Sequence, residues 1–107
     1  MVRGRIEIPD EALAEFCRRW KITELALFGS ALRDDFRPDS DVDFLVRFAP
    51  DANWSLLKIV GIEEELGRII GRKADLVSRQ AIERSYNWIR RKEILETAQV
   101  IYAAHAA

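Results

Sequence analysis

Apolar residues recur with two different periods along the chain, and these periods predict alternating strands and helices. Four short, mostly apolar runs read as strands: residues 22–28, 41–48, 73–78 and finally 99–103. The first, ITELALF, ends at Gly29. The second alternates, which predicts one wholly apolar face and an opposite face that carries Asp41, Asp43 and Leu45.

Longer stretches repeat apolar residues every three or four positions, as amphipathic helices do. They run from about residue 10 to 20, from about 54 to 70 and from 86 to about 98. In the first helix Asp10 can cap free amides, and the second should end at Gly71. The second should direct one set of residues inward and Glu63, Glu64 and Glu65 mostly toward water. The inward set is Leu56, Ile59, Ile62, Leu66 and Ile69.

This order of elements indicates an α/β (α+β) fold. We expect one domain over residues 1–107, with a small sheet of about three to four strands flanked by helices. The chain is 49% hydrophobic and 33% charged, with a formal net charge of −1, so no general attraction draws it to nucleic acid or membrane. Its one cysteine excludes an internal disulfide framework, and its start resembles no signal peptide. We therefore expect a cytoplasmic protein.

The negative charges of the two aspartates at the start of the second strand need a positive partner. Residues two apart on a strand point the same way, so Asp41 and Asp43 present their carboxylates side by side. A divalent cation is the natural partner of such a pair, and Mg²⁺ takes carboxylates together with phosphate oxygens and water. Gly29 allows a ligand close to the backbone, and Ser30 offers a hydroxyl and an amide at the start of a short helix, which favours phosphate. Asp75, in the third strand, can join this site if the two strands are neighbours.

The motif Gly29-Ser30, then ten residues, then Asp41-x-Asp43 resembles the nucleotidyltransferase superfamily that includes DNA polymerase beta. The chain is most similar to its minimal nucleotidyltransferase (MNT) domains. Arg33, Ser40 and the apolar run after Asp43 match their pattern, whereas Asp34-Asp35 stands where many relatives have glycine. The resemblance covers nearly the whole chain.

The resemblance implies a nucleotidyltransferase fold with a mixed sheet, and transfer of AMP from ATP to a hydroxyl with two Mg²⁺ ions. It assigns metal ligation and catalysis to Asp41, Asp43 and Asp75, and nucleotide binding to Gly29, Ser30, Arg33 and Ser40. It also implies a partner that brings the acceptor, because larger relatives use a further domain for this. MNT domains are commonly antitoxins of HEPN-type toxins, and some adenylylate a tyrosine of the toxin.

Two other functions remain open: a non-catalytic antitoxin that masks its toxin, and a transferase for a small molecule or nucleic acid. The intact set of three acids favours the modifying enzyme over masking. The near-neutral charge argues against direct nucleic-acid binding.

Several side chains also have ordinary structural interpretations. Arg33 can pin its loop by an ion pair, and Ser40 can cap the turn. Cys17 belongs on the apolar face of the first helix, and His105 in an alanine-rich tail. The three tryptophans are expected in the core, although an exposed one can anchor a partner. The segment from residue 72 to residue 92 contains seven basic and two acidic residues. Such a segment is usually a solvated surface and less often a contact with toxin or triphosphate.

Overall fold

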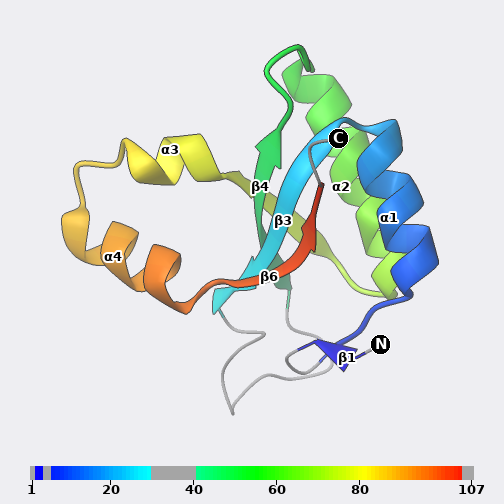
Figure 1. Cartoon of the computed structure of the whole chain (residues 1–107), viewed down its shortest axis with the longest axis horizontal. Coiled ribbons are helices and arrows are strands. Elements are labelled where there is room, and N and C mark those ends of the chain that lie inside the picture. The colour runs from blue at the N-terminus through cyan, green and yellow to red at the C-terminus, as the bar shows by residue number, and fades with distance from the viewer. Residues whose placement is uncertain (1, 4–5, 30–40, 105–107) are drawn as a thin grey trace.

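The computed structural model of the chain describes residues 2–3, 6–29 and 41–104. Its centre is a four-stranded sheet in the order β5–β4–β3–β6 (Figure 1). The strands are β3 (Ile22–Phe28), β4 (Val42–Phe48), β5 (Ala74–Ser78) and β6 (Gln99–Ala103). β5 runs parallel to β4, and the other neighbours are antiparallel. The four predicted strands and the mixed α+β sheet are confirmed.

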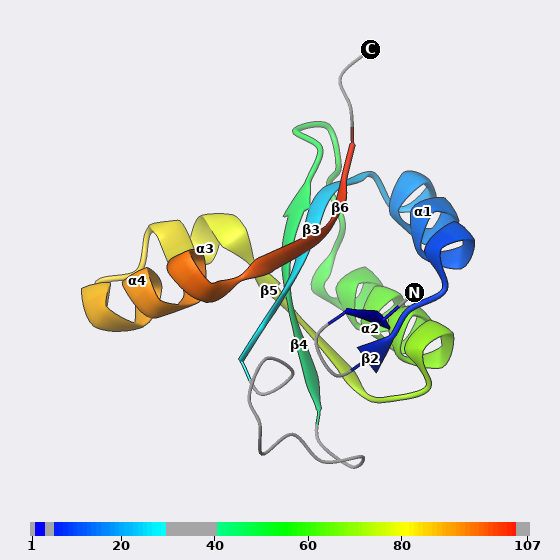
Figure 2. The same cartoon turned by 60° about the horizontal axis from the view of Figure 1, so that its bottom comes forward.

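In the described part of the chain, helices cover both faces of this sheet (Figures 1 and 2). One face packs against α1 (Asp10–Arg19) and α2 (Leu56–Ile70). The other packs against α3 (Arg79–Glu83) and α4 (Trp88–Thr97). The sequence did not predict α3, nor the small antiparallel ribbon of β1 (Val2–Arg3) and β2 (Ile6–Glu7).

The larger hydrophobic core lies between the sheet and the α1–α2 layer. It contains one face of β4, as the alternation predicted, and one apolar stripe from each helix. Its buried members are Ile8, Leu13, Phe16, Cys17, Ile22, Leu25, Leu27, Val42, Phe44, Val46, Ile62, Leu66 and Ala74. Burial raises the pKa of Cys17 to about 12, so this thiol is a core residue, as expected.

A smaller core lies on the opposite face, beneath α3 and α4. Its buried members are Ala26, Phe28, Leu45, Ile82 and Ile94. Two ion pairs add to this contact: Arg79 with Glu24 at 2.6 Å, and Arg47 with Glu83 at 3.1 Å. The short helix α3 is therefore attached to the sheet by charges as well as by Ile82.

Several predictions about the helices were wrong in detail. Asp10 lies in the first turn of α1, while Pro9 occupies the capping position and offers no side-chain hydrogen bond. Leu56 is 82% exposed, because α2 begins there, capped by Ser55, beyond the edge of the core. Glu63 and Glu65 are half-buried rather than solvated. Gly71 does end α2, with φ +72°, in the left-handed region that glycine adopts readily.

The three tryptophans differ in how far they are buried. Trp20 and Trp54 pack edge to face against the larger core, with ring centroids 5.4 Å apart. Their indole nitrogens donate to Glu65 at 2.8 Å and to the carbonyl of Trp20 at 2.9 Å, respectively. Trp88 is 60% exposed, against the expectation that it would be buried.

Candidate functional site

The carboxyl end of β3 meets the start of β4 at Gly29. This residue has φ +73°, where side chains with a Cβ are strained. A Cβ built on Gly29 would lie 2.6 Å from Oδ2 of Asp43, closer than non-bonded atoms approach. Only glycine therefore lets the Asp43 carboxylate lie against the backbone at this turn.

Asp75 lies beside Asp43 on the neighbouring strand. Asp43 and Asp75 are register partners in the parallel pair β4–β5. Register partners on adjacent strands face the same side of a sheet, so both carboxylates belong to the face that α3 and α4 partly cover. This face also holds Leu45 and Val77, which follow two residues later on each strand and pack against the smaller core. Strands β4 and β5 are neighbours, which is the condition under which Asp75 was predicted to join Asp41 and Asp43.

Asp41 stands just before β4 and is exposed. Its Oδ2 lies 3.8 Å from Nζ of Lys73, and the backbone amide of Val42 donates to the carbonyl of Lys73 at 2.9 Å. The residue before β5 is thus held next to the residue before β4. Lys73 brings a positive charge to the acidic end of the sheet, a role that the sequence argument did not assign.

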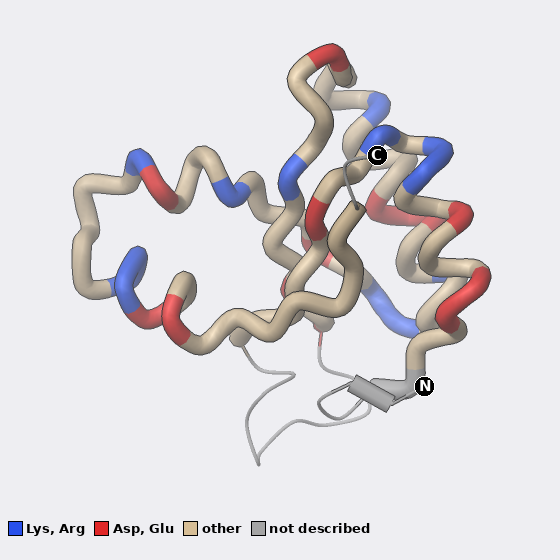
Figure 3. The backbone as a smooth tube through the Cα atoms, in the orientation of Figure 1, with Lys and Arg blue, Asp and Glu red and all other residues tan. Residues whose placement is uncertain are grey.

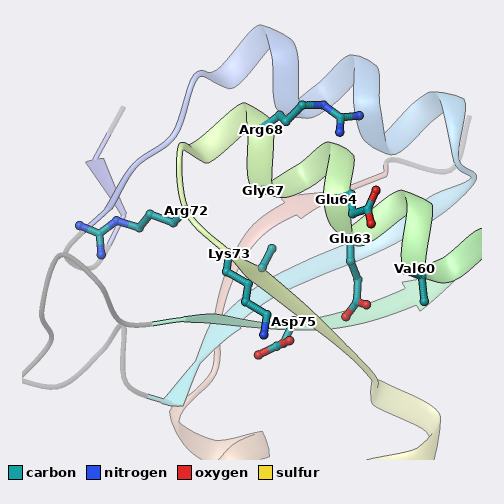
Figure 4. Close-up of a pocket in the computed structure, with 9 residues that line it drawn as sticks. Val60, Glu63, Glu64, Gly67, Arg68, Arg72, Lys73 and Asp75 are labelled. Atoms are coloured by element: carbon teal, nitrogen blue, oxygen red, sulfur yellow. The ribbon is translucent and has the colours of Figure 1, made fainter.

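Beside Asp75, an open cleft of about 470 Å³ separates α2 from the edge strand β5 (Figure 4). Its lining carries both signs of charge, with three acidic and three basic residues: Glu63, Glu64, Arg68, Arg72, Lys73 and Asp75, together with Val60, Gly67 and Ala74. Glu63 has a structural task here, because its Oε2 accepts a 2.6 Å hydrogen bond from the amide of Leu76. It fixes the edge strand that carries Asp75.

The donor chemistry of these side chains fits Mg²⁺. Carboxylate oxygens are its preferred protein ligands, and one or two suffice when phosphate oxygens and water complete the shell. Within residues 2–3, 6–29 and 41–104, no three His, Cys, Asp or Glu side chains are already arranged around one ion position. Ser30, Arg33 and Ser40, the other predicted nucleotide-binding residues, lie outside the described residues, as does the expected helix that follows Gly29.

The chain matches a known protein family over most of its length. A family model described as Nucleotidyltransferase domain matches residues 9–101. The chain therefore belongs to the nucleotidyltransferase domain family, which confirms the resemblance seen in the motif. A relative from Thermococcus cleftensis, named Protein adenylyltransferase MntA, is 38% identical over 69 residues, which are 64% of this chain and 68% of the relative.

Solved structures share the fold. A crystal structure described as a toxin-antitoxin with AMP-PNP aligns with a TM-score of 0.67 at 17% identity, over 92% of this chain and 76% of that one. A structure of a candidate minimal nucleotidyltransferase aligns with a TM-score of 0.62 at 28% identity, over 87% of each chain. A crystal structure of the toxin-antitoxin MntA-HepT aligns with a TM-score of 0.58 at 16% identity, over 89% of this chain and 70% of that one.

In the described part of the chain, no helix is both long enough and apolar enough to cross a membrane.

Proposed function

We propose that the chain is the nucleotidyltransferase antitoxin of a HEPN-type toxin and that it transfers AMP from ATP to a hydroxyl, most simply a tyrosine, of that toxin. The observation that supports this most directly is the contact between Gly29 and Asp43, beside Asp75 in register. The family and the name of the 38% identical relative support adenylyl transfer. The toxin-antitoxin complexes among the structural neighbours support a toxin as the partner.

In this proposal Asp41, Asp43 and Asp75 would hold two Mg²⁺ ions, which would neutralise charge on the phosphate oxygens. Gly29 keeps the turn narrow so that the triphosphate can approach the backbone, and Ser30, Arg33 and Ser40 contribute further contacts to it. Lys73, next to Asp41, adds positive charge on the same side. The reaction takes place in the cytoplasm.

The transfer exchanges a phosphoanhydride bond of ATP for a phosphoester bond to the acceptor. The acceptor oxygen forms a bond to the α-phosphorus of ATP, and the bond from that phosphorus to the bridging oxygen breaks. Pyrophosphate leaves with the electron pair of that bond. Asp75 lies on the edge strand, where an incoming chain can reach it, and accepts the proton of the acceptor hydroxyl.

The test uses the purified chain, α-labelled ATP, Mg²⁺ and the protein encoded by the adjacent gene. We expect label on the partner and an AMP adduct on one of its hydroxyl residues by mass spectrometry. Omission of Mg²⁺, or replacement of Asp43 by Asn, should abolish the label. Protection of cells by Asp43→Asn at wild-type level, with no adduct formed by the wild type, would show that the chain only masks its toxin.

A further inference from the structure

The first half of α4 and the turn before it expose three large apolar side chains within four residues. Tyr86 is 103% exposed, Trp88 60% and Ile89 61%. Single exposed apolar residues are common on protein surfaces, but a group of this size that includes two aromatic rings marks an interaction surface. We call Tyr86, Trp88 and Ile89 the α4 patch.

The turn that presents the α4 patch is held by its own hydrogen bonds. The Ser85 hydroxyl accepts from the amide of Asn87 at 3.2 Å, and the Asn87 side chain accepts from the amide of Arg90 at 3.1 Å. The guanidinium of Arg91 donates to the carbonyl of Ser85 at 3.3 Å. The backbone that carries the patch is therefore held in place, which lowers the entropy lost when a partner binds.

Basic residues lie near the patch in the sequence. Arg84, Arg90 and Lys92 are exposed, and none of them forms an ion pair with a residue that the structure describes. Figure 3 shows basic positions along the first half of α4, followed by acidic ones in its second half. An acidic surface with an apolar centre would complement the first half of α4 in charge and in polarity.

The patch also stands on the same side of the molecule as the acidic site. α3 and α4 pack on the sheet face that carries Asp43 and Asp75, as Leu45 and Val77 show. A protein seated on α4 therefore approaches that face and can present a hydroxyl to it. α1 and α2 lie on the opposite face, to the right of the sheet in Figure 2, and we call this face the back of the sheet.

We infer that the α4 patch, with its rim of Arg84, Arg90 and Lys92, is the docking site for the protein that supplies the acceptor hydroxyl, and that this protein presents an acidic, partly apolar surface there. The inference rests on the proposed function for the identity of the partner. The residue types fit, since Trp, Tyr and Arg dominate the binding energy of protein interfaces.

The experiment compares two matched pairs of variants. On α4 these are Trp88→Ala and Lys92→Glu. On α2, behind the sheet, the controls are Leu57→Ala, where the leucine is 83% exposed, and Lys58→Glu. Lys58→Glu removes the contact of the Lys58 ammonium with the Trp20 ring, 5.2 Å from its centroid, but Lys58 is the third residue after the capping Ser55, a position that favours glutamate, so this control should still fold.

The affinity for the protein encoded by the adjacent gene is measured by calorimetry at low and moderate salt, with circular dichroism as the test of folding. Trp88→Ala should weaken binding by roughly tenfold or more, and Lys92→Glu by several-fold with a smaller dependence on salt. Leu57→Ala and Lys58→Glu should stay within about twofold of the wild type. In the transfer assay, Trp88→Ala should raise the KM for the partner and leave the KM for ATP unchanged.

Three outcomes overturn the inference: no binding by the wild type, equal losses in the α2 and α4 pairs, or an α4 effect that appears only with single-stranded RNA or in self-association by ultracentrifugation. Binding that depends on α4 without any transfer of AMP would keep the docking site and reject the proposed function. AMP transfer to the partner that is unaffected by Trp88→Ala would support the proposed function and reject the docking site.

Discussion

The two faces of the sheet are built differently, and the difference separates what stabilises the fold from what is free for function. Behind the sheet, α1 and α2 cover a core of thirteen buried residues, including Phe16 and Phe44. In front, α3 and α4 cover five buried residues among those that the structure describes, and ion pairs add to the contact. The front face also carries Asp43 and Asp75. A thin layer on that side leaves room for ligands and keeps apolar residues of α4 in solvent.

The largest effect is expected at the front face, on chemistry and not on stability. Asp43→Asn and Asp75→Asn should each reduce AMP transfer by at least about a hundredfold, because in the proposed site each would remove a carboxylate ligand of Mg²⁺. Both residues are only half-buried, so thermal unfolding should change little. Single-turnover transfer and a melting curve measure the two effects. A melting temperature that falls sharply in both variants would mean that the acids stabilise the fold.

The second prediction compares the two cores with the same substitution. Ile62, fully buried behind the sheet, and Ile94, 7% exposed in front, are each replaced by Ala. Ile62→Ala should lower the free energy of unfolding by about 3–4 kcal/mol, and Ile94→Ala by about 2, because the thinner layer can collapse around the cavity. Urea denaturation measures both values.

Hydrogen exchange sharpens that comparison. In Ile94→Ala the amides of α3 and α4 should exchange faster while those of α1 and α2 keep their protection. In Ile62→Ala protection should fall throughout. If protection fell equally at all amides in both variants, the two helix layers would unfold as one unit. The two layers would then not differ in local stability.

The larger core was predictable from sequence because periodicity reports burial directly. The alternation in β4 placed Val42, Phe44 and Val46 inside, and the spacing in α2 placed Ile62 and Leu66 there, as the structure has them. That Asp75 lies beside Asp43 was predictable for a different reason: the sequence placed both on strands, and neighbouring strands bring such residues to one face.

What the sequence did not reveal depends on contacts between distant residues. Helix α3 has five residues, too few for a repeat, and is positioned by Ile82 and by its ion pairs. Glu63 reads as a solvated residue of α2 until its bond to the amide of Leu76 is seen. The exposure of Trp88 likewise follows from the position of α4 at the margin of the smaller core. The one feature of the sequence that hinted at this exposure was the excess of basic residues between residues 72 and 92.

The third prediction uses two glycines with the same backbone conformation and different surroundings. Gly29 and Gly71 have φ of +73° and +72°, but a Cβ on Gly71 would meet no atom within 4 Å. Gly71→Ala should therefore cost only the left-handed strain, about 1 kcal/mol, and leave transfer intact. Gly29→Ala should cost more, displace the Asp43 carboxylate and lower transfer by roughly tenfold or more. Equal activity in the two variants would remove Gly29 from the site.

The smallest effect concerns the ion pairs that attach α3. Arg79 and Glu24 are 26% and 30% exposed, and their contact of 2.6 Å links α3 to β3. Part of the gain is offset, because the buried Nε of Arg79 has no hydrogen-bond partner among the described residues. Arg79→Met should thus lower the free energy of unfolding by about 1 kcal/mol or less, and the loss should diminish at high salt.

The control for this variant is Lys21→Met, which breaks an exposed pair. Lys21 and Asp51 are 2.9 Å apart, and the hydrogen bond from Lys21 lowers the pKa of Asp51. Solvent screens this pair, so the substitution should leave urea denaturation unchanged at neutral pH. Because Arg79 acts on the front layer, Arg79→Met should also weaken partner binding slightly through α4, whereas Lys21→Met should not. A larger loss of stability from Lys21→Met than from Arg79→Met would contradict the idea that partly buried charges help to hold the front layer on the sheet.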